Sequence, residues 1–346
     1  MLFAQCIYKC YDSNAFIANY ASFIMESFTV IFEQLKHHIQ KEGNSIIYND
    51  TKKVHISAYL FKPIPEQTEE KKITFIDGGN AELLSGPQFS IGFIRLCATQ
   101  YEGIKTKNIQ KKEFFVLITM TQKEGSLVYQ TSSFQNGYTF PDFSAFDPSL
   151  TQGNHRATPQ AVTDRIRTIS ELLFMNELSS DILVRDGELR FYSKEENTIL
   201  DTLLKKNKTI VGIGKTNTLI TDTANSATAV LHTLSPKGSW SYLLGKNEKD
   251  ISSFLVRLHP NSEYIFTCDI GPFDVTIFSS LQTLSKDPLF LGYPYGLLAA
   301  DQYARVSNQE KEMLMIQFLA TAGKDAALLK PYLRAQDAHG VLDTIK

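Results

Sequence analysis

The 346-residue sequence has few cysteines, and none of them is in a zinc-binding arrangement. The four cysteines, Cys6, Cys10, Cys97 and Cys268, include no Cys-x-x-Cys pair. This spacing argues against a structural zinc site. We expect reduced thiols, as is usual in a cytoplasmic protein.

The chain also lacks a strong net charge and a long apolar run. Its formal net charge is −2, so any binding of nucleic acid must use local basic patches. No uninterrupted apolar run reaches the ~20 residues that span a bilayer. The first residues lack the basic start and continuous apolar core of a signal peptide. We therefore expect a cytoplasmic protein without a membrane segment, and its 43% hydrophobic residues can form a sizeable core.

Two apolar stretches each end in an Asp-Gly pair. Residues 73–76 lead into Asp77, and residues 182–184 lead toward Asp186. A short apolar run of this kind predicts a buried strand. In α/β sheets the chemistry is found at the carboxyl ends of such strands. The two carboxylates could meet there and hold a divalent metal, although each Asp-Gly pair could also be a simple turn.

The chain before the first of these strands reads as a helix and an arm. Apolar residues at helical spacing predict a helix over about residues 12–42. This helix could pack on its own domain, form a dimer contact or dock a partner. Residues 45–61 read as a strand pair or an extended arm, and the charged residues 62–72 read as a solvated linker.

A meander is expected at the start of the sheet. Residues 73–80, 89–99 and 113–121 read as three consecutive strands, which favours antiparallel pairing. The lysine-rich connection before the third strand contains Lys105 and Lys107. It reads as a solvated hairpin tip, and a loop that contacts phosphate is the alternative.

A helix with a carboxylate on a partly apolar face comes next. After an irregular stretch over residues 134–158, Thr158 caps a predicted helix with Pro159 at its first position. In this helix, Glu171 could form an ion pair with Arg167 one turn earlier. If Glu171 is buried it needs a partner, and a metal would serve.

Further elements follow the second Asp-Gly strand. Helices are expected at 194–206, 223–234 and 274–285, and strands at 209–214, 240–244, 254–259 and 263–270. Lys215 comes after the strand at 209–214, but the preceding residues lack the Gly-x-x-x-x-Gly-Lys spacing of a phosphate loop. Lys215 is therefore either a lone cation at the end of the sheet or an ordinary surface lysine.

The last informative stretch surrounds Asp301. Gly292, Pro294 and Gly296 predict a rigid turn, and a helix containing Asp301 follows. The aspartate is either a site residue or a residue of the helix surface. Residues 308–346 read as helical and charged, without evident chemistry.

Taken together, the acids form an ordered set: one at a strand end, one on a helix, one at a later strand end and one on a late helix. Two-metal phosphoryl transfer needs such a set, because several carboxylates must hold cations on both sides of the scissile phosphate. Ligands made only of oxygen suit Mg²⁺ or Mn²⁺ rather than zinc.

The sequence resembles the NurA nuclease family from about residue 70 to 310. The resemblance is carried by five segments in the same order: residues 76–79, the pair Arg167 and Glu171, residues 183–189, residues 212–216, and residues 292–297 together with Ala300 and Asp301. It implies a ribonuclease H-like α/β fold, in which helices flank a mixed sheet. The implied domains are an arm (1–70), the nuclease domain (71–310) and a helical tail (311–346).

The resemblance also implies roles for individual residues. Asp77, Glu171 and Asp186 would bind Mn²⁺ or Mg²⁺, and Asp301 would occupy a late-helix position where many members have histidine. Lys215 would contact phosphate. The implied DNA-binding residues are Arg167 and Tyr293, to which the lysine-rich connection adds Lys105 and Lys107.

The implied activities are a 5′ to 3′ exonuclease and a single-strand endonuclease in the resection of double-strand breaks. The implied partners are DNA, a HerA-like hexameric ATPase and a second copy of the chain. Two other classes stay open. An actin-like ATPase or kinase shares the core fold, but the sequence shows no second phosphate hairpin. A catalytically silent subunit that binds DNA or docks an ATPase would not need the acids.

Overall fold

The computed structural model describes residues 13–39, 43–49, 52–65, 70–135, 137–151, 153, 155–206, 208–329 and 331. By internal contacts the chain forms two units, one of Met1–Ala58 with Thr218–Ser235 and one of Tyr59–Asn217 with Pro236–Lys346. No helix in the described part of the chain is both long and apolar enough to cross a membrane. The predicted domain boundaries at residues 70 and 310 stay predictions.

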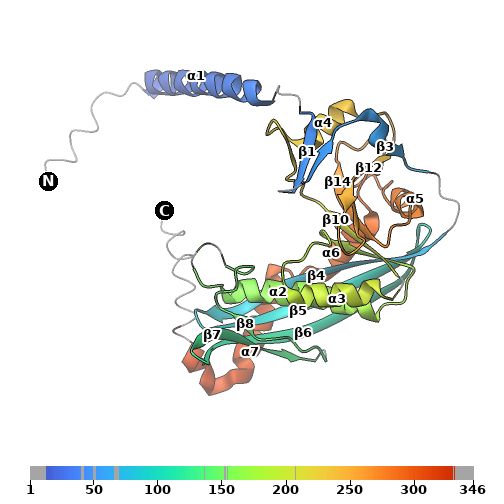
Figure 1. Cartoon of the computed structure of the whole chain (residues 1–346). Helices are drawn as coiled ribbons and strands as arrows, with labels where there is room; N and C mark the ends of the chain where they lie inside the picture. The colour runs from blue at the N-terminus through green and yellow to red at the C-terminus, as the bar shows by residue number, and fades with distance from the viewer. Residues whose placement is uncertain are drawn as a thin grey trace. The chain divides into compact units, whose positions relative to one another are not determined.

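The smaller unit contains a long helix and a small sheet. Helix α1 (Ser13–Ile39) confirms the predicted helix, while residues 12 and 40–42 lie outside the described residues. Strand β1 (Ser45–Asn49) pairs antiparallel with β2 (Lys52–His55) and with β11 (Ile220–Thr221), and α4 (Ala227–Leu234) follows. The alternative of a strand pair over 45–61 is therefore correct for its first half (Figure 1).

The larger unit is built on one mixed sheet of eleven strands. Its centre is an antiparallel meander of β4 (Lys72–Gly86), β5 (Phe89–Glu102) and β6 (Lys105–Lys123). Strand β4 also pairs in parallel with β9 (Ile182–Asp186), and β9 pairs in parallel with β10 (Thr209–Gly214). The predicted meander is therefore confirmed, and the strand that contains Asp77 is a neighbour of the strand that ends at Asp186.

Additional antiparallel strands extend the sheet on both sides. Next to β10 the order is β14 (Phe266–Gly271), β13 (Ser252–Arg257), β12 (Trp240–Lys246) and β3 (Phe61–Pro63). Next to β6 lie β7 (Ser126–Phe134) and β8 (Phe143–Ser144). The sequence interpretation missed β7.

The lysine-rich connection between β5 and β6 is shorter than expected. Most of the predicted loop belongs to the two strands, and the turn is confined to the two residues between Glu102 and Lys105. The connection is a solvated hairpin as predicted, but its exposed residues belong to the strands. The strands are longer than expected because these residues lack the apolar alternation that would reveal them.

Helices cover both faces of the sheet. On one face, α2 (Pro159–Glu177) packs on the meander and α3 (Lys194–Leu204) packs on α2 (Figure 1). On the other face, α5 (Thr276–Thr283) and α6 (Tyr295–Ala304) share a core with the strands. Side chains alternate between the faces along β4, since Ile76 joins the core under α2 and Phe75 the core under α6.

The start of α2 follows the predicted capping chemistry. The Thr158 hydroxyl accepts a hydrogen bond from the Ala161 backbone N–H at 3.2 Å, and Pro159 is the first helical residue. Beyond α6, α7 (Asn308–Ala322) also contacts β4, and a 3₁₀ segment (Gly323–Leu329) follows. The rest of the predicted C-terminal helix, residues 332–346, lies outside the described residues.

Gly296 lets α6 approach the sheet, and its replacement is a test of that packing. A Cβ atom added at Gly296 would overlap the ring of Phe75, which is fully buried. We expect Gly296→Ala to lower the free energy of unfolding by about 1–3 kcal/mol, measured by urea denaturation. Gln302→Ala, at an exposed position of the same helix, is the control. Equal midpoints for the two variants would contradict the packing.

Candidate active site

The register of β4 and β9 places two aspartates side by side. In this parallel pair Ile76 lies opposite Arg185, so the following residues, Asp77 and Asp186, are adjacent. Asp186 is the last residue of β9, but β4 continues past Asp77 to Gly86 because Gly78 and Gly79 keep pairing with β5, so the prediction that Asp77 ends its strand is wrong. Asp77 comes two residues after Phe75 in β4, so both side chains point to the same face of the sheet. This is the face that α6 covers. The sheet thus brings together two acids that are more than one hundred positions apart in the sequence.

Helix α6 adds a third carboxylate to the same place. Asp77, Asp186 and Asp301 line one open cavity of about 360 Å³. The Asp301 carboxylate pairs with Arg305 at 2.9 Å, one turn later in the helix. The remaining lining residues are Gly78, Gly79, Asn80, Arg167, Ala304, Arg305 and Val306.

Glu171 approaches the site from the opposite face of the sheet. It is 1% exposed, and its carboxylate forms ion pairs with two arginines, Arg167 through Oε1 and Arg185 through Oε2 at 3.0 Å. Arg167 also donates to the Gly78 carbonyl at 3.2 Å. A Cβ at Gly78 would lie 2.7 Å from Glu171 Oε1. The glycine after Asp77 is therefore what allows the glutamate to reach the strand.

Arg185 also belongs to the site, as an ion-pair partner of Glu171. The sequence analysis did not identify it. The predicted pairing of Glu171 with Arg167 is present, but the second guanidinium comes from β9. A basic residue in an otherwise apolar strand was the available signal, because a charge that is mostly buried needs a partner. Arg185 is also buried and donates to the Glu188 carbonyl at 2.7 Å.

Lys215 and Tyr293 hold Asp186. The Lys215 ammonium forms an ion pair with Asp186 Oδ2, and the Tyr293 hydroxyl donates to Asp186 Oδ1 at 3.3 Å. The Lys215 ammonium also lies 5.5 Å from the centre of the Tyr293 ring. Tyr293 is 1% exposed, so in this structure its ring belongs to the core and its hydroxyl supports Asp186.

Burial and charge make Asp77 an unusual carboxylate. Burial raises the pKa of Asp77 to about 7, and the negative charges of Glu171 and Asp186 add to this shift. In the described part of the chain, its carboxylate has no cationic side chain within ion-pair distance and accepts a hydrogen bond only from the Gly78 backbone N–H, at 2.8 Å. The Gly78 hydrogen bond and the attraction of Lys215 offset this shift only in part, so the charged form of Asp77 costs folding free energy.

Neighbouring carboxylates raise the pKa values of Lys215 and Arg167, which favours their charged forms. Burial alone would lower the pKa of Lys215, but its hydrogen bond and attraction to Asp186 raise the pKa overall. The attraction of Glu171 raises the pKa of Arg167. Burial and the Asp186 charge raise the pKa of the Tyr293 hydroxyl, so this group stays a neutral donor.

The three aspartates of the cavity offer the carboxylate oxygens that a hard divalent cation prefers. Asp77 has no ion-pair partner in the described part of the chain, and two further carboxylates line its cavity, which offers oxygen ligands alone. Within the described ranges, however, no group of three or more acidic, histidine or cysteine side chains is arranged to hold an ion. Glu171 and Asp186 are instead paired with Arg167, Arg185 and Lys215.

The structure does not bring Lys105 and Lys107 into this cavity. Both are exposed at the start of β6, where Lys107 pairs with Glu102 at 2.8 Å. Arg167, in contrast, lines the cavity directly. Asn80 and Arg305 also line it, and no sequence pattern had singled them out.

The comparisons with known proteins find structural likeness only. No family model matches the chain, and no curated protein matches its sequence. The structure is similar to the NurA nuclease from Sulfolobus solfataricus, with a TM-score of 0.53 and 14% sequence identity over 89% of this chain and 97% of that one. It is also similar to the catalytic domain of human endonuclease V, with a TM-score of 0.36 and 12% identity over 81% of this chain and 94% of that one.

The likeness to NurA agrees with the topology. The strand order β6-β5-β4-β9-β10, with the first three antiparallel and the last two parallel to β4, is the arrangement of the ribonuclease H-like core. The predicted fold class, a mixed sheet flanked by helices, is confirmed. The chain therefore has a ribonuclease H-like fold and is similar in structure to a NurA nuclease across most of both chains.

Proposed function

We propose that this protein is a metal-dependent nuclease that hydrolyses phosphodiester bonds of DNA. One observation carries the proposal: Asp77 and Asp186, on adjacent parallel strands, share a cavity with Asp301. Carboxylates gathered at one site are the ligands that divalent-metal hydrolysis of phosphate esters needs. The buried Asp77, whose charge is compensated only in part, supports the assignment, because a cation would offset its cost.

Asp77 and Asp186 would hold the metal, with Asp301 as the third oxygen donor at the rim. A divalent cation held by these residues would supply Lewis-acid chemistry for the hydrolysis of a phosphodiester. Lys215 lies beside Asp186 and is about half exposed, so its ammonium can contact the phosphate as negative charge develops. Glu171 keeps Arg167 and Arg185 in place next to Gly78.

The finer function follows the sequence resemblance and the likeness in fold. We propose that the enzyme uses Mn²⁺ or Mg²⁺, has 5′ to 3′ exonuclease and single-strand endonuclease activity, and acts in break-end resection. We also propose that it works as a homodimer with a HerA-like hexameric ATPase. The structural likeness to a NurA nuclease over 97% of that chain supports the nuclease activity, and the sequence resemblance supplies the rest of this set.

An assay with end-labelled DNA tests the function. Single- and double-stranded substrates are incubated with Mn²⁺, Mg²⁺ or EDTA, with and without the cognate ATPase. We expect cleavage only with a divalent cation, and none from Asp186→Asn. Metal-independent cleavage, or equal rates for this variant and the wild type, would refute the proposal.

Lys215→Gln is predicted to slow cleavage without unfolding the protein. Removing one positioned donor to a developing negative charge costs on the order of 10²-fold in kcat, whereas Lys215 is 45% exposed and contributes little to packing. Lys205→Gln, an exposed lysine at the end of α3, is the control. The kinetics of single-stranded DNA cleavage are measured for both variants. Unchanged kcat in Lys215→Gln would remove the lysine from the reaction.

A catalytically silent DNA-binding subunit is the second candidate. It is favoured by the ion pairs of Glu171 and Asp186, because cationic side chains occupy the oxygens that a metal would use. Calorimetric titration with Mn²⁺ separates the candidates. The nuclease binds the ion, and the silent subunit does not.

A further inference from the structure

A buried aspartate lies outside the candidate active site and takes no part in the proposed reaction. Asp269 belongs to β14 and is 1% exposed. In the described part of the chain, no basic side chain lies within ion-pair distance of its carboxylate. The carboxylate accepts hydrogen bonds from the Leu189 backbone N–H, at 2.9 Å, and from the Ser253 hydroxyl. Burying a charge without a direct ion pair is costly, so these hydrogen bonds point to a role for the aspartate.

The register of the sheet places Asp269 in one row with Arg185. Gly212 of β10 lies opposite Arg185 of β9 on one side and opposite Asp269 of β14 on the other. Residues that lie opposite one another in neighbouring strands project from the same face of a sheet, so a cation and an anion flank a glycine. A Cβ atom added at Gly212 would lie 2.6 Å from the Gly187 carbonyl oxygen and 3.0 Å from the Leu189 nitrogen. The glycine therefore leaves the space in which the turn after β9 lies.

The peptide group between Glu188 and Leu189 lies between these two charges. Its carbonyl accepts a hydrogen bond from Arg185 at 2.7 Å, and its N–H donates to Asp269 at 2.9 Å. The peptide dipole thus has its oxygen toward the cation and its hydrogen toward the anion. Hydrogen bonds to charged groups are stronger than those between neutral groups, so Arg185 and Asp269 together fix the orientation of this peptide.

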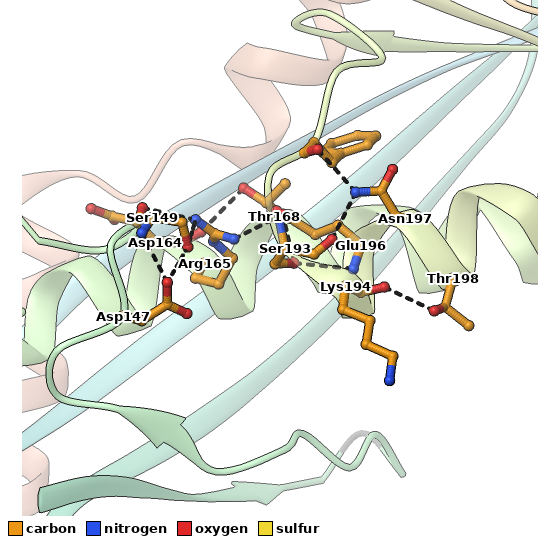
Figure 2. A network of polar contacts seen from close by, with 11 residues as sticks. Asp147, Ser149, Asp164, Arg165, Thr168, Ser193, Lys194, Glu196, Asn197 and Thr198 are labelled. Atoms are coloured by element: carbon orange, nitrogen blue, oxygen red, sulfur yellow. Dashed lines mark hydrogen bonds and ion pairs between the residues drawn. The ribbon is translucent and has the colours of Figure 1, made fainter. Parts of the chain in front are cut away.

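The far end of the same segment is fixed independently by α2 and α3 (Figure 2). The Asn197 side chain donates to the carbonyls of Phe191 and Ser193, at 2.9 and 2.8 Å. Ser193 forms a capping box with Glu196, and Glu196 pairs with Arg165 of α2 at 2.9 Å. The end that adjoins α3 is therefore held without the buried aspartate of β14, which acts on the end that adjoins β9.

Asp186 is separated from the anchored Leu189 by a glycine with an unusual backbone conformation. Gly187 has a φ of +102°, and its N–H donates to the Ile213 carbonyl at 2.8 Å. Because glycine permits many conformations, the direction of the Asp186 carboxylate depends on the groups that hold this turn. We propose that Asp269 is a positioning residue: it anchors the turn after β9 and thereby keeps the Asp186 carboxylate directed into the cavity of the three aspartates. The inference rests on the proposed nuclease function and deepens it, because it names a residue that acts on a metal ligand from outside the site.

Hydrogen exchange of the Leu189 backbone amide tests the anchor in the metal-free protein. Asp269→Ala removes the acceptor, so exchange at Leu189 is expected to become about 10- to 100-fold faster, the effect of losing one hydrogen bond to a charged group. Asp269→Asn keeps an oxygen for Leu189 and gains an amide that can donate to Ser253, so it is expected to restore most of the protection. Unchanged exchange in Asp269→Ala, or equally fast exchange in both variants, would refute the anchor.

Ser180→Ala is the matched control for a general loss of stability. Ser180 is buried just before β9, at the end of the strand opposite to the turn, and its hydroxyl bonds with Thr74 and with Gln100. The substitution breaks buried hydrogen bonds beside the same strand but touches neither the turn nor the aspartates. It is expected to leave Leu189 exchange and Mn²⁺ binding unchanged. Equal changes in Asp269→Ala and Ser180→Ala would show an effect on overall stability alone and would refute positioning.

The Mn²⁺ affinity, measured by calorimetry, tests whether the anchor acts on Asp186. Loss of a group that orients a metal ligand from behind typically changes metal affinity by about 10- to 100-fold, and Asp269→Ala is expected to raise Kd for Mn²⁺ by this factor. In cleavage assays the loss should fall on kcat and leave KM for DNA within about twofold, because a buried residue does not contact the substrate. Faster exchange at Leu189 with an unchanged Kd for Mn²⁺ would contradict the positioning of Asp186.

The exchange and binding measurements separate this inference from the proposed function. If the wild type binds Mn²⁺ and cleaves DNA, but Asp269→Ala changes neither exchange nor Kd nor kcat, the positioning role is wrong and the nuclease remains. If the wild type binds no Mn²⁺ and cleaves no DNA, while Asp269→Ala still speeds exchange at Leu189, the nuclease proposal fails and the anchoring of the turn stands.

Discussion

Asp77→Asn is expected to abolish cleavage and at the same time to stabilise the metal-free protein. Loss of a metal-binding carboxylate should reduce kcat on the order of 10³-fold or more. In contrast, the substitution removes a buried charge for which burial and the repulsion of Glu171 and Asp186 outweigh the attraction of Lys215. We expect the thermal midpoint in EDTA to rise by a few degrees near pH 8.

The gain in stability from Asp77→Asn should increase with pH, because the pKa of Asp77 is raised in the folded protein. Because the pKa of Asp77 is about 7 in the folded protein and 3.8 as its ordinary value, the folded state binds more protons between these limits. Its stability contribution is therefore fully present below pH 4 and is lost progressively as the pH rises from 4 to 7. Asparagine does not titrate, so Asp77→Asn should stabilise the protein clearly more at pH 8 than at pH 5. Equal gains at both pH values would contradict the cause.

Glu171→Gln is expected to have the opposite effect on stability. Glu171 neutralises two arginines, and Arg185 is itself buried. Removing one partner of a buried ion pair usually costs about 3–5 kcal/mol, because the remaining charge is left without compensation. We expect a loss of that size in the free energy of unfolding, measured by urea denaturation at pH 7.

Glu177 provides the matched control on the same helix. Its carboxylate pairs with Lys112 at 2.8 Å and is about half exposed. A solvent-exposed pair is worth about 0–1 kcal/mol, so Glu177→Gln should change stability little. If Glu171→Gln costs no more than Glu177→Gln, Glu171 does not hold the arginines in solution, and a role limited to metal binding would be favoured instead.

Asp77→Asn and Glu171→Gln together distinguish two acids, Asp77 and Glu171, that the sequence analysis treated alike. From the residues, Asp77 and Glu171 were both metal-ligand candidates. In the described part of the chain Asp77 has no cationic side chain within ion-pair distance, only the more distant attraction of Lys215, whereas Glu171 is paired with two arginines. A carboxylate can serve as metal ligand or as counter-ion depending on its neighbours, and those neighbours come from other elements that a single sequence does not align.

Parts of the site were nevertheless predictable from the chain alone. An apolar run that leads into Asp-Gly predicts a carboxylate at the end of a strand, and Asp186 occupies such a position. Asp77 does not, because β4 continues to Gly86. Their adjacency depends on the parallel pairing of β4 and β9, which no local pattern specifies. Arg185 was overlooked as an ion-pair partner because its guanidinium faces away from Asp186, toward α2.

The fold was least predictable where strands are polar. Strand β6 begins with exposed residues from Lys105, and β7 is largely exposed as well. Such strands lack the apolar alternation that marks a half-buried strand. Each is held by its neighbour in the sheet, β6 by β5 and β7 by β6. The central buried strands and the capped helix α2 followed the pattern closely.

Crystals grown with Mn²⁺ give the most direct measurement of the central claim, that Asp77 and Asp186 share a cation. Anomalous diffraction locates the ion independently of activity. The account predicts an anomalous peak in the cavity of the three aspartates, within coordination distance of both the Asp77 and Asp186 carboxylates. A fully occupied ion elsewhere, or an empty cavity with Lys215 still paired to Asp186 at saturating Mn²⁺, would contradict it.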